Sequence, residues 1–302
     1  MHSPFFSIII PTFNSEKTLQ STLNSILEQV FTDLEIIIID GMSGDATVAL
    51  IEENFRKDRR IRYVSEADHG IYDAMNKGID MAKGQWIYFL GSDDYLSGKN
   101  VLQVVNDSLK DCKCDFFYGQ VLMKGVKYDG PLSLEKLLVK NISHQAIFYR
   151  RQIFEKNGKY NLRYKFHADW EFNIRYFLKV EEDVQYEDIL IANFGAGGVS
   201  AEHDVLFLQE FLVPLKLQRL SRNPDSVKNI RRYDEWWRLL RNANIRRPEQ
   251  LQPPGSGYII PAVIQRMVKW QQLFSPALLR IGIVSKTSMF LSYLINIVTK
   301  EK

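Results

Sequence analysis

The alternation of β-rich runs with helical stretches over the first 120 residues constrains the fold more than any other feature of this chain. Short apolar runs rich in isoleucine and aromatic residues alternate with stretches whose apolar residues recur at helical spacing. This repetition predicts βαβ units, and therefore an α/β fold with a mostly parallel sheet flanked by helices. The predicted strands are residues 6–10, 34–39, 61–64, 86–90 and 116–118. The predicted helices are residues 19–30, with Ser15 as a candidate cap, and about 46–55, 71–82 and 101–109.

Acidic residues follow two of these predicted strands. Asp40 ends the second strand, and Asp93-Asp94 comes directly after the fourth. Parallel sheets bind ligands beyond the carboxyl ends of their strands, so we expect both positions to face the same crevice. Asp40 can accept a hydrogen bond from a base or a ribose hydroxyl, or it is a turn residue. Backbone groups of Pro11 and Thr12, at the matching end of the first strand, could line a nucleotide site.

The pair Asp93-Asp94 has the chemistry of a divalent-cation site. Mg²⁺ typically takes one or two protein carboxylates and completes its shell with water and substrate phosphates. A metal held in this way neutralises charge on a departing diphosphate. The alternative is a solvated turn, because aspartate is common in loops.

Three further polar residues are candidates for the site. Lys77, in the polar stretch 66–78, could reach a base or phosphate, or it belongs to the solvated face of a helix. Asp169 could act as a general base towards an acceptor hydroxyl, or it caps the helix that follows. His144, followed by Gln145, could bind a sugar or phosphate, or it is a structural histidine.

Charge is distributed unevenly along the chain. Residues 214–302 hold 16 Lys+Arg against 5 Asp+Glu, whereas residues 1–213 hold 23 against 31. An acidic body and a basic tail indicate two different roles, with the tail meeting an anionic surface. The stretch 258–298 combines apolar stripes and Trp270 with basic residues, which is typical of helices lying in a membrane interface. The alternatives are a helical hairpin on the catalytic domain or the interface of a homo-oligomer.

The compartment is predicted from what the sequence lacks. The amino terminus has no signal-peptide pattern, and no apolar run reaches the roughly 18 residues of a membrane span. Cys112 and Cys114 are expected to be reduced thiols, and one C-x-C is too few ligands for zinc. We therefore expect a cytoplasmic protein, peripheral on the inner face of the membrane, without a nucleic-acid partner.

Three motifs occur in order along residues 5–110: Phe6-Ser7-Ile8-Ile9-Ile10-Pro11-Thr12-Phe13-Asn14, Ile38-Ile39-Asp40-Gly41-Met42-Ser43-Gly44-Asp45-Ala46-Thr47 and Tyr88-Phe89-Leu90-Gly91-Ser92-Asp93-Asp94. Together they closely resemble family 2 glycosyltransferases with the GT-A fold. The stretch 66–78 and residues 166–171 are similar to the branch that builds bacterial cell-surface polysaccharides. The resemblance weakens towards residue 200 and ends there.

The resemblance implies an inverting transfer from a nucleoside-diphosphate sugar, with UDP as the base by family frequency, to a lipid-linked glycan. A hexose or N-acetylhexosamine is the sugar expected. Residues 1–204 would be the catalytic domain, with a donor half to about 120 and an acceptor half after it, and residues 205–302 a basic helical region. The resemblance implies that Pro11, Thr12 and Asp40 bind the nucleoside and that Asp68 and Lys77 lie near the base or the diphosphate. It implies that Asp93 and Asp94 ligate Mn²⁺ or Mg²⁺ and that Asp169 is the general base. The loop Gly197-Gly198-Val199-Ser200 would close over the diphosphate.

This chain departs from the family pattern at one point. Many members carry a further aspartate where this sequence has Gly91 or Ser92, which leaves open whether Asp93 or Asp94 ligates the metal. A nucleotidyltransferase is an alternative, but such enzymes usually carry a Gly-rich basic loop where Pro11 to Asn14 stand. A non-enzymatic sugar-nucleotide binder is the second alternative. A dehydrogenase is disfavoured because no G-x-G-x-x-G follows the first strand.

Overall fold

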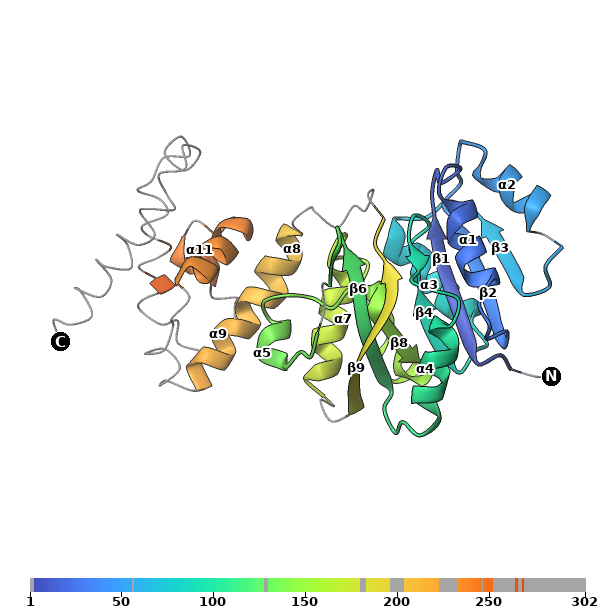
Figure 1. Ribbon diagram of the computed structural model, residues 1–302. Coiled ribbons are helices and arrows are strands. Elements are labelled where there is room, and N and C mark those ends of the chain that lie inside the picture. Colours follow the sequence, from blue (N-terminus) through green and yellow to red (C-terminus); the bar gives the residue numbers. More distant parts are fainter. Residues whose placement is uncertain are drawn as a thin grey trace. The chain divides into compact units, whose positions relative to one another are not determined.

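The computed structural model describes residues 3–55, 57–127, 130–179, 183–195, 204–222, 233–245, 247–251, 264–265 and 268 (Figure 1). The chain forms two compact units, Met1–Glu202 and His203–Lys302. The first contains the sheet, and the described residues of the second contain helices.

One sheet of nine strands runs through the described part of the first unit, in the order β3-β2-β1-β4-β8-β6-β9-β5, with β7 paired to β6. Strands β1 to β4 run parallel to their neighbours, as predicted. Beyond β4 the sheet is mixed, because β8 is antiparallel to both β4 and β6. The strands are β1 Phe6–Thr12, β2 Leu34–Asp40, β3 Ile61–Ser65, β4 Trp86–Phe89, β5 Tyr95–Leu96, β6 Phe116–Met123, β7 Val126–Lys127, β8 Ile147–Arg150 and β9 Val184–Asn193.

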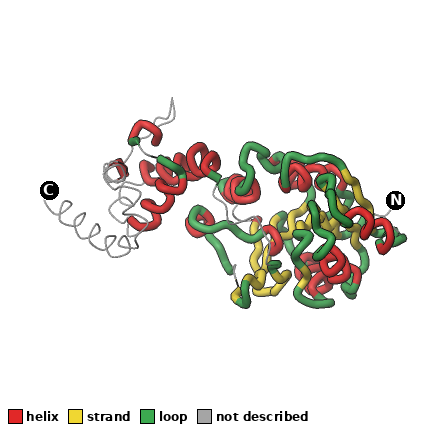
Figure 2. The backbone as a smooth tube through the Cα atoms, turned by 90° about the horizontal axis from the view of Figure 1, so that it is seen from above, coloured by secondary structure: helices red, strands yellow, loops and turns green. Residues whose placement is uncertain are grey.

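Helices lie on both sides of these strands (Figure 2). Every residue of β1 and β2 is buried, which explains why their apolar runs show no alternation. Helix α3 packs against both strands. Its Gly78 lies so close to Ile9 that an added Cβ would be 2.4 Å from Ile9 Cγ2. The helices of this unit are α1 Leu19–Leu27, α2 Thr47–Asn54, α3 Ile71–Met81, α4 Val101–Lys110, α5 Leu134–Leu137, η1 His144–Ala146, α6 Gln152–Asn157 and α7 Ala168–Phe177.

The structure corrects the prediction at the start of α1. Thr18, and not Ser15, occupies the N-cap position, and α1 ends at Leu27. The Ser15 hydroxyl lies 2.8 Å from Ser92 Oγ, in the loop after β4. A tertiary contact therefore takes the hydroxyl that local reasoning assigned to the helix end.

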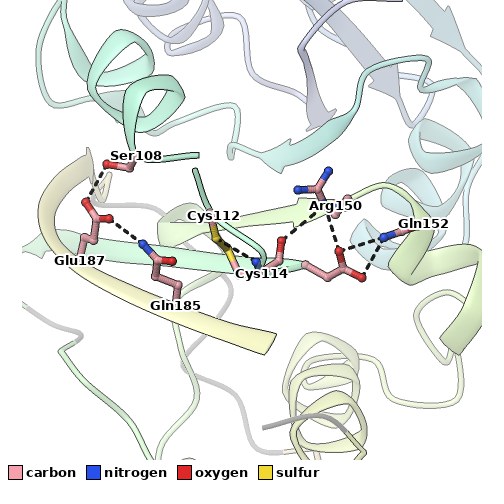
Figure 3. The surroundings of a disulfide bond; sticks show 8 residues. Ser108, Cys112, Cys114, Arg150, Gln152, Gln185 and Glu187 are labelled. Atoms are coloured by element: carbon pink, nitrogen blue, oxygen red, sulfur yellow. Dashed lines mark hydrogen bonds and ion pairs between the residues drawn. A yellow bond between two sulfur atoms is a disulfide. The ribbon is translucent and has the colours of Figure 1, made fainter. Parts of the chain in front are cut away.

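The two cysteines also differ from expectation. Cys112 and Cys114 form a disulfide in the turn between α4 and β6 (Figure 3). Their Cα atoms are 5.2 Å apart, within the range that a disulfide spans. The Arg150 Nε donates to the Cys114 carbonyl at 3.4 Å and pairs with Asp115 at 2.9 Å, which fixes this turn to the edge of β8.

Most described residues of the second unit lie in helices, as predicted for residues 205–247. Asp204 caps its first helix by accepting from Phe207 N at 3.1 Å. Of the predicted segment 258–298, only Ile264, Gln265 and Val268 are among the described residues. No described helix is both long and apolar enough to cross a membrane. The elements are α8 Val205–Phe207, η3 Leu208–Leu212, α9 Val213–Arg222, α11 Tyr233–Asn242 and η4 Pro248–Leu251.

Candidate active site

The first two strands end side by side, as the sequence predicted for Pro11, Thr12 and Asp40. Pro11 is in register with Ile39, and Thr12 is in register with Asp40. Gly41 N donates to the Thr12 carbonyl at 2.9 Å, which extends the pairing one residue beyond β2. The parallel register therefore brings these three predicted residues to one edge of the sheet.

The Asp40 carboxylate is completely buried. Its Oδ2 accepts from Ser43 N at 3.0 Å and from Ser65 Oγ at 2.6 Å. Asp40 thereby holds the loop after β2 against the last residue of β3. Sequence reasoning missed both serines, although Ser65 is the residue of β3 in register with Asp40.

Hydrogen bonds between side chains and backbone tie the loops after β1 and β2 together. Asn14 N donates to Ser43 Oγ at 2.7 Å, and Asn14 Oδ1 accepts from Gly44 N at 2.9 Å. Asn14 has a φ of 48°, a left-handed conformation that asparagine tolerates better than most residues. With the Ser15–Ser92 contact, the loops after β1, β2 and β4 form one connected surface.

Asp68 lies over the end of β2. An added Cβ on Gly41 would be 2.5 Å from Asp68 Oδ2, so only glycine leaves room for this carboxylate. Asp68 Oδ1 accepts from Gly70 N at 2.9 Å. The structure therefore brings Asp68 next to the residue that follows Asp40, in agreement with a shared nucleotide site.

Lys77 is held by its own segment. Its Nζ donates to the Ala67 carbonyl at 2.8 Å and pairs with Glu66 Oε1 at 2.9 Å, with Asp73 at 3.8 Å. The hydrogen bond that Lys77 donates to Glu66 raises the pKa of Lys77. Lys77 thus stays charged at neutral pH, and a phosphate would compete with Glu66 for it.

Asp94 is almost fully buried, with 2% of its surface exposed. Its Oδ2 accepts from Gln145 Nε2 at 2.7 Å, and its Oδ1 accepts from Gly195 N at 2.7 Å. These two donors hold the carboxylate in place without a neighbouring cation. Asp94 is consequently an oriented carboxylate, and the solvated-turn alternative does not describe it.

Gly91 lies too close to the two aspartates to carry a side chain. An added Cβ on Gly91 would be 2.5 Å from Asp94 Oδ2 and 3.1 Å from Asp93 Oδ1. A side chain at this position would therefore push both carboxylates aside. Asp93 is only partly buried, and its backbone carbonyl packs against Gly195.

The residues present fit a hard divalent cation. Two carboxylates of adjacent residues converge beside Gly91, and carboxylate oxygens are the ligands that Mg²⁺ and Mn²⁺ prefer. Among the described residues no group of three or more His, Cys, Asp or Glu could hold a metal. The donor set therefore fits a cation that takes its remaining ligands from a diphosphate and water.

Asp169, the second residue of α7, is buried and accepts hydrogen bonds at both oxygens. Oδ1 accepts from Tyr72 Oη at 2.7 Å and from Trp170 N at 2.8 Å, and Oδ2 accepts from Asn141 Nδ2 at 2.9 Å. Its alternative role as a helix cap is not the observed one, because His167 occupies the N-cap position of α7. Tyr72 and Asn141 come from distant parts of the chain, whereas Trp170 is the next residue.

Two opposing effects act on the pKa of Asp169. Burial raises it, but the nearby His144 and the hydrogen bond from Tyr72 outweigh burial and hold the pKa below the usual value. Burial, and then the charge of Asp169, raise the pKa of Tyr72 well above its ordinary value. At neutral pH the carboxylate is therefore ionised and the tyrosine protonated.

One short turn contacts both buried carboxylates. In η1, His144 Nδ1 lies 3.7 Å from Asp169 Oδ2, and the next residue, Gln145, donates to Asp94. The Tyr88 hydroxyl, from β4, donates to the Gln145 carbonyl at 2.9 Å and fixes the turn to the sheet. The structure thus brings Asp94 and Asp169, 75 positions apart in the sequence, to two sides of one turn.

This arrangement agrees with a comparison of sequences. The family model described as "Glycosyl transferase family 2" matches residues 7–184, which cover β1 through the start of β9 and include both carboxylates. The chain belongs to glycosyltransferase family 2. As a glycosyltransferase it has the activity expected from its motifs, and family membership favours a transferase over the nucleotidyltransferase and the non-enzymatic binder.

Curated relatives of this glycosyltransferase carry names from the same chemistry. A protein named "PGL/p-HBAD biosynthesis glycosyltransferase" in Mycobacterium bovis and in Mycobacterium tuberculosis is 40% identical over 224 residues. The match covers 72% of this chain and 86% of the relative.

Solved structures show the same GT-A fold. S. aureus TarS 1–349 in complex with UDP-GlcNAc has a TM-score of 0.59 at 18% identity, with 79% of each chain covered. In a longer TarS structure this glycosyltransferase spans about half of that chain, 49%. The mannosyltransferase PcManGT from Pyrobaculum calidifontis, in complex with GDP-Man and Mn²⁺, has a TM-score of 0.54 at 14% identity, with 91% of this chain and 82% of that chain covered.

Proposed function

We propose that this glycosyltransferase moves a hexose or N-acetylhexosamine from a UDP-sugar to an acceptor hydroxyl with inversion at the anomeric carbon. The observation that carries the proposal is the turn His144–Gln145, which touches Asp94 on one side and Asp169 on the other. A carboxylate suited to the departing diphosphate and a carboxylate suited to the attacking hydroxyl belong to one connected site.

Asp169 takes the role of general base. The acceptor oxygen forms a bond to the anomeric carbon while its proton passes to Asp169. The bond from the anomeric carbon to the diphosphate oxygen breaks, and its electron pair leaves with UDP. One attack from the face opposite the leaving group inverts the stereocentre. The lowered pKa of Asp169 keeps the base ionised and ready at neutral pH.

Asp93 and Asp94 hold Mn²⁺ or Mg²⁺ in this proposal. The cation supplies charge neutralisation for the diphosphate. Gln145 and Gly195 orient the Asp94 carboxylate. Asp93 is more exposed than Asp94 and is therefore the more accessible carboxylate for a ligand. Pro11, Thr12, Asp40 and Asp68 bind the nucleoside at the ends of β1 and β2.

The acceptor is a lipid-linked glycan or glycolipid of the cell surface, which the names of the mycobacterial relatives support. The basic second unit attaches the enzyme to the inner face of the cell membrane. Support for this comes from the excess of 11 positive charges in residues 214–302. The loop Gly197-Gly198-Val199-Ser200, proposed to close over the diphosphate, lies outside the described residues.

Donor hydrolysis tests the proposal without knowledge of the acceptor, because water takes the acceptor's place. The full chain is incubated with UDP-GlcNAc and a panel of other UDP-sugars, with and without Mn²⁺. We expect slow, Mn²⁺-dependent UDP release with one donor. Proton NMR should show the β-anomer of the free sugar first from an α-linked donor.

The matched control is Asp80→Asn, which changes a carboxylate that is 64% exposed and paired with Lys159. This variant should release UDP at the wild-type rate, whereas Asp169→Asn should not. First appearance of the α-anomer would overturn the inverting mechanism. UDP release that is indifferent to Mn²⁺ and to chelation would overturn the metal assignment alone.

A further inference from the structure

A chain of three hydrogen bonds runs through Tyr149, Asn173 and Asn141 and ends on Asp169. Tyr149 Oη donates to Asn173 Oδ1 at 2.9 Å, and Asn173 Nδ2 donates to Asn141 Oδ1 at 2.9 Å. Asn141 Nδ2 then donates to Asp169 Oδ2, also at 2.9 Å. Tyr149 and Asn173 have no exposed surface, so water does not take the place of either. We call these three residues the relay.

The direction of the relay follows from the charge at its end. An ionised carboxylate only accepts hydrogen bonds, so Asn141 must turn its amide nitrogen towards Asp169. Its oxygen then faces Asn173 and requires a donor there, which in turn leaves Asn173 Oδ1 facing Tyr149. Burial, and then the charge of Asp169, raise the pKa of Tyr149 well above its ordinary value, so its hydroxyl keeps the proton that it donates.

The hydrogen-bond donors around Asp169 occupy all but one of the lone-pair sites of its carboxylate. A carboxylate has about four lone-pair sites, two on each oxygen. Tyr72 and Trp170 N occupy both sites of Oδ1, and Asn141 occupies one site of Oδ2. The second site of Oδ2 faces His144, whose Nδ1 lies 3.7 Å away and thus beyond hydrogen-bond distance.

We propose that Asn141 and Asn173 are positioning residues, which hold Asp169 so that Oδ2 receives the acceptor proton at its site beside His144. The inference rests on the proposed role of Asp169 as general base. The relay acts by keeping one Oδ2 lone pair occupied and the other aimed outwards. It also stabilises the charged form of Asp169, since a donor to a carboxylate lowers its pKa.

The experiment measures how kcat/KM for hydrolysis of the UDP-sugar depends on pH, with UDP release as the readout. Asn141→Ala removes a hydrogen-bond donor to a charged group, so the acidic limb should move upwards by about one pH unit or more. Asn141→Asp keeps the shape of the side chain but replaces the donor with a second negative charge. We expect Asn141→Asp to shift the acidic limb further than Asn141→Ala does. If Asn141 only filled space, Asn141→Asp would give the smaller shift, because it keeps the shape of the side chain.

Effects should decrease with distance along the relay. Asn173→Asp removes the donor to Asn141, and Tyr149→Phe removes only a hydroxyl, so their shifts should follow Asn141→Asp in that order. The KM for the donor should stay near the wild-type value in each variant that folds, because no relay residue contacts the donor end of the site in the proposal. If the asparagine variants do not fold, the pH profile of Tyr149→Phe still tests the relay.

Other titratable groups near Asp169 can also change the pH profile, and their effects must be distinguished from that of Asp169. Tyr72 from α3, His144 from η1, Tyr149 from β8, Tyr160 and His167 all interact with the Asp169 charge. Each variant is therefore also measured in a His144→Gln background, because the His144 side chain lies beside Asp169 Oδ2. Asn106→Ala, at a buried asparagine of α4, is the control and should leave the pH profile unchanged.

Two outcomes distinguish the inference from the proposed function. If Asp169→Asn abolishes hydrolysis but the Asn141 variants keep the wild-type acidic limb, the relay has no positioning role and the base assignment stands. If Asp169→Asn hydrolyses donor at the wild-type rate, the base assignment fails, and the positioning role fails with it. An Asn141→Asp shift smaller than that of Asn141→Ala would also overturn the inference.

Discussion

At the scale of single residues, the site consists of carboxylates that are oriented before any ligand arrives. Asp40, Asp94 and Asp169 are all buried, and each accepts at least two hydrogen bonds. Burial of an ionised group without partners costs several kcal/mol, so these donors are what makes the carboxylates tolerable in the core. The same donors fix the directions in which the remaining lone pairs point.

The first prediction concerns Asp169→Asn. An amide cannot take a proton from the acceptor, and general-base catalysis is typically worth about 10²–10⁴-fold, so kcat should fall by that range. Calorimetric titration with UDP and Mn²⁺ should give a Kd within about threefold of wild type, since Asp169 is proposed to contact the acceptor only. Near-normal turnover would remove Asp169 from the reaction.

The second prediction uses the pKa of Asp169, which lies below its ordinary value of 3.8 in the folded protein. The ionised carboxylate therefore contributes stability that is present above pH 3.8 and lost as the pH falls through the lower folded-state value. Urea unfolding between pH 6 and 3 should show a steeper loss of stability in wild type than in Asp169→Asn. Equal slopes would mean that Asp169 is not selectively stabilised in its charged form.

The third prediction concerns the turn at Gly91. In Gly91→Ala the new Cβ would lie 2.5 Å from Asp94 Oδ2, so the carboxylate must move. We expect Mn²⁺-dependent UDP binding to weaken by roughly tenfold, the equivalent of about 1.4 kcal/mol. Gly98→Ala is the control, because nothing lies within 4 Å of its added Cβ. Wild-type affinity in Gly91→Ala would show that the position of Asp94 does not govern metal-dependent binding.

At the scale of elements, the packing of α3 on the sheet decides where the polar stretch 66–78 sits. Tyr72, in the first turn of α3, reaches Asp169, while Gly78, in its last turns, lies against Ile9 of β1. The close approach at one end of the helix thus determines the reach of the side chain at the other. A residue remote from the chemistry positions one of the donors to the proposed base.

The fourth prediction tests this close approach. Gly→Ala inside a helix ordinarily stabilises by about 0.5–1 kcal/mol, but overpacking a core costs about 1–3 kcal/mol. With Ile9 Cγ2 only 2.4 Å from the added Cβ, Gly78→Ala should lower the free energy of unfolding in urea by about 1 kcal/mol or more. Gly98→Ala should stay within about 0.5 kcal/mol of wild type. A stabilised Gly78→Ala would contradict the packing described for α3.

At the scale of the whole molecule, charge separates the two units along the sequence. Residues 1–213 have an excess of 8 acidic residues and residues 214–302 an excess of 11 basic ones. A cation would offset the repulsion between an acidic body and an anionic nucleotide, and a basic segment is attracted to anionic lipid. The charge pattern therefore agrees with both proposed partners, the metal and the membrane surface.

The fifth prediction follows from the basic segment. The full chain should float with vesicles that contain anionic lipid and not with purely zwitterionic ones. Changing Arg266, Lys269, Arg280 and Lys286 together to Gln removes about 1 kcal/mol per charge near the surface, or up to about 10³-fold in partitioning. Equal flotation of wild type and this variant at low salt would remove the electrostatic part of the membrane proposal.

The sequence by itself determined the parallel half of the sheet, because runs such as 34–39 are apolar at every position but Glu35 and only burial on both faces accommodates them. It also placed Asp40 and Asp93-Asp94 at strand ends, since the length of each run fixes where its strand stops. The mixed half, from β8 onwards, and the short β5 after Asp94 carry no such local signal.

What only the tertiary structure decided is which side chains serve these carboxylates. Ser65 reaches Asp40, Gln145 reaches Asp94, and Asn141 reaches Asp169, each from a distant part of the chain. Periodicity reports burial but not partners, because a hydrogen bond depends on the position of two atoms that the sequence places far apart. The Ser15 hydroxyl belongs with these, because its contact with Ser92 replaces the local cap that its position suggested.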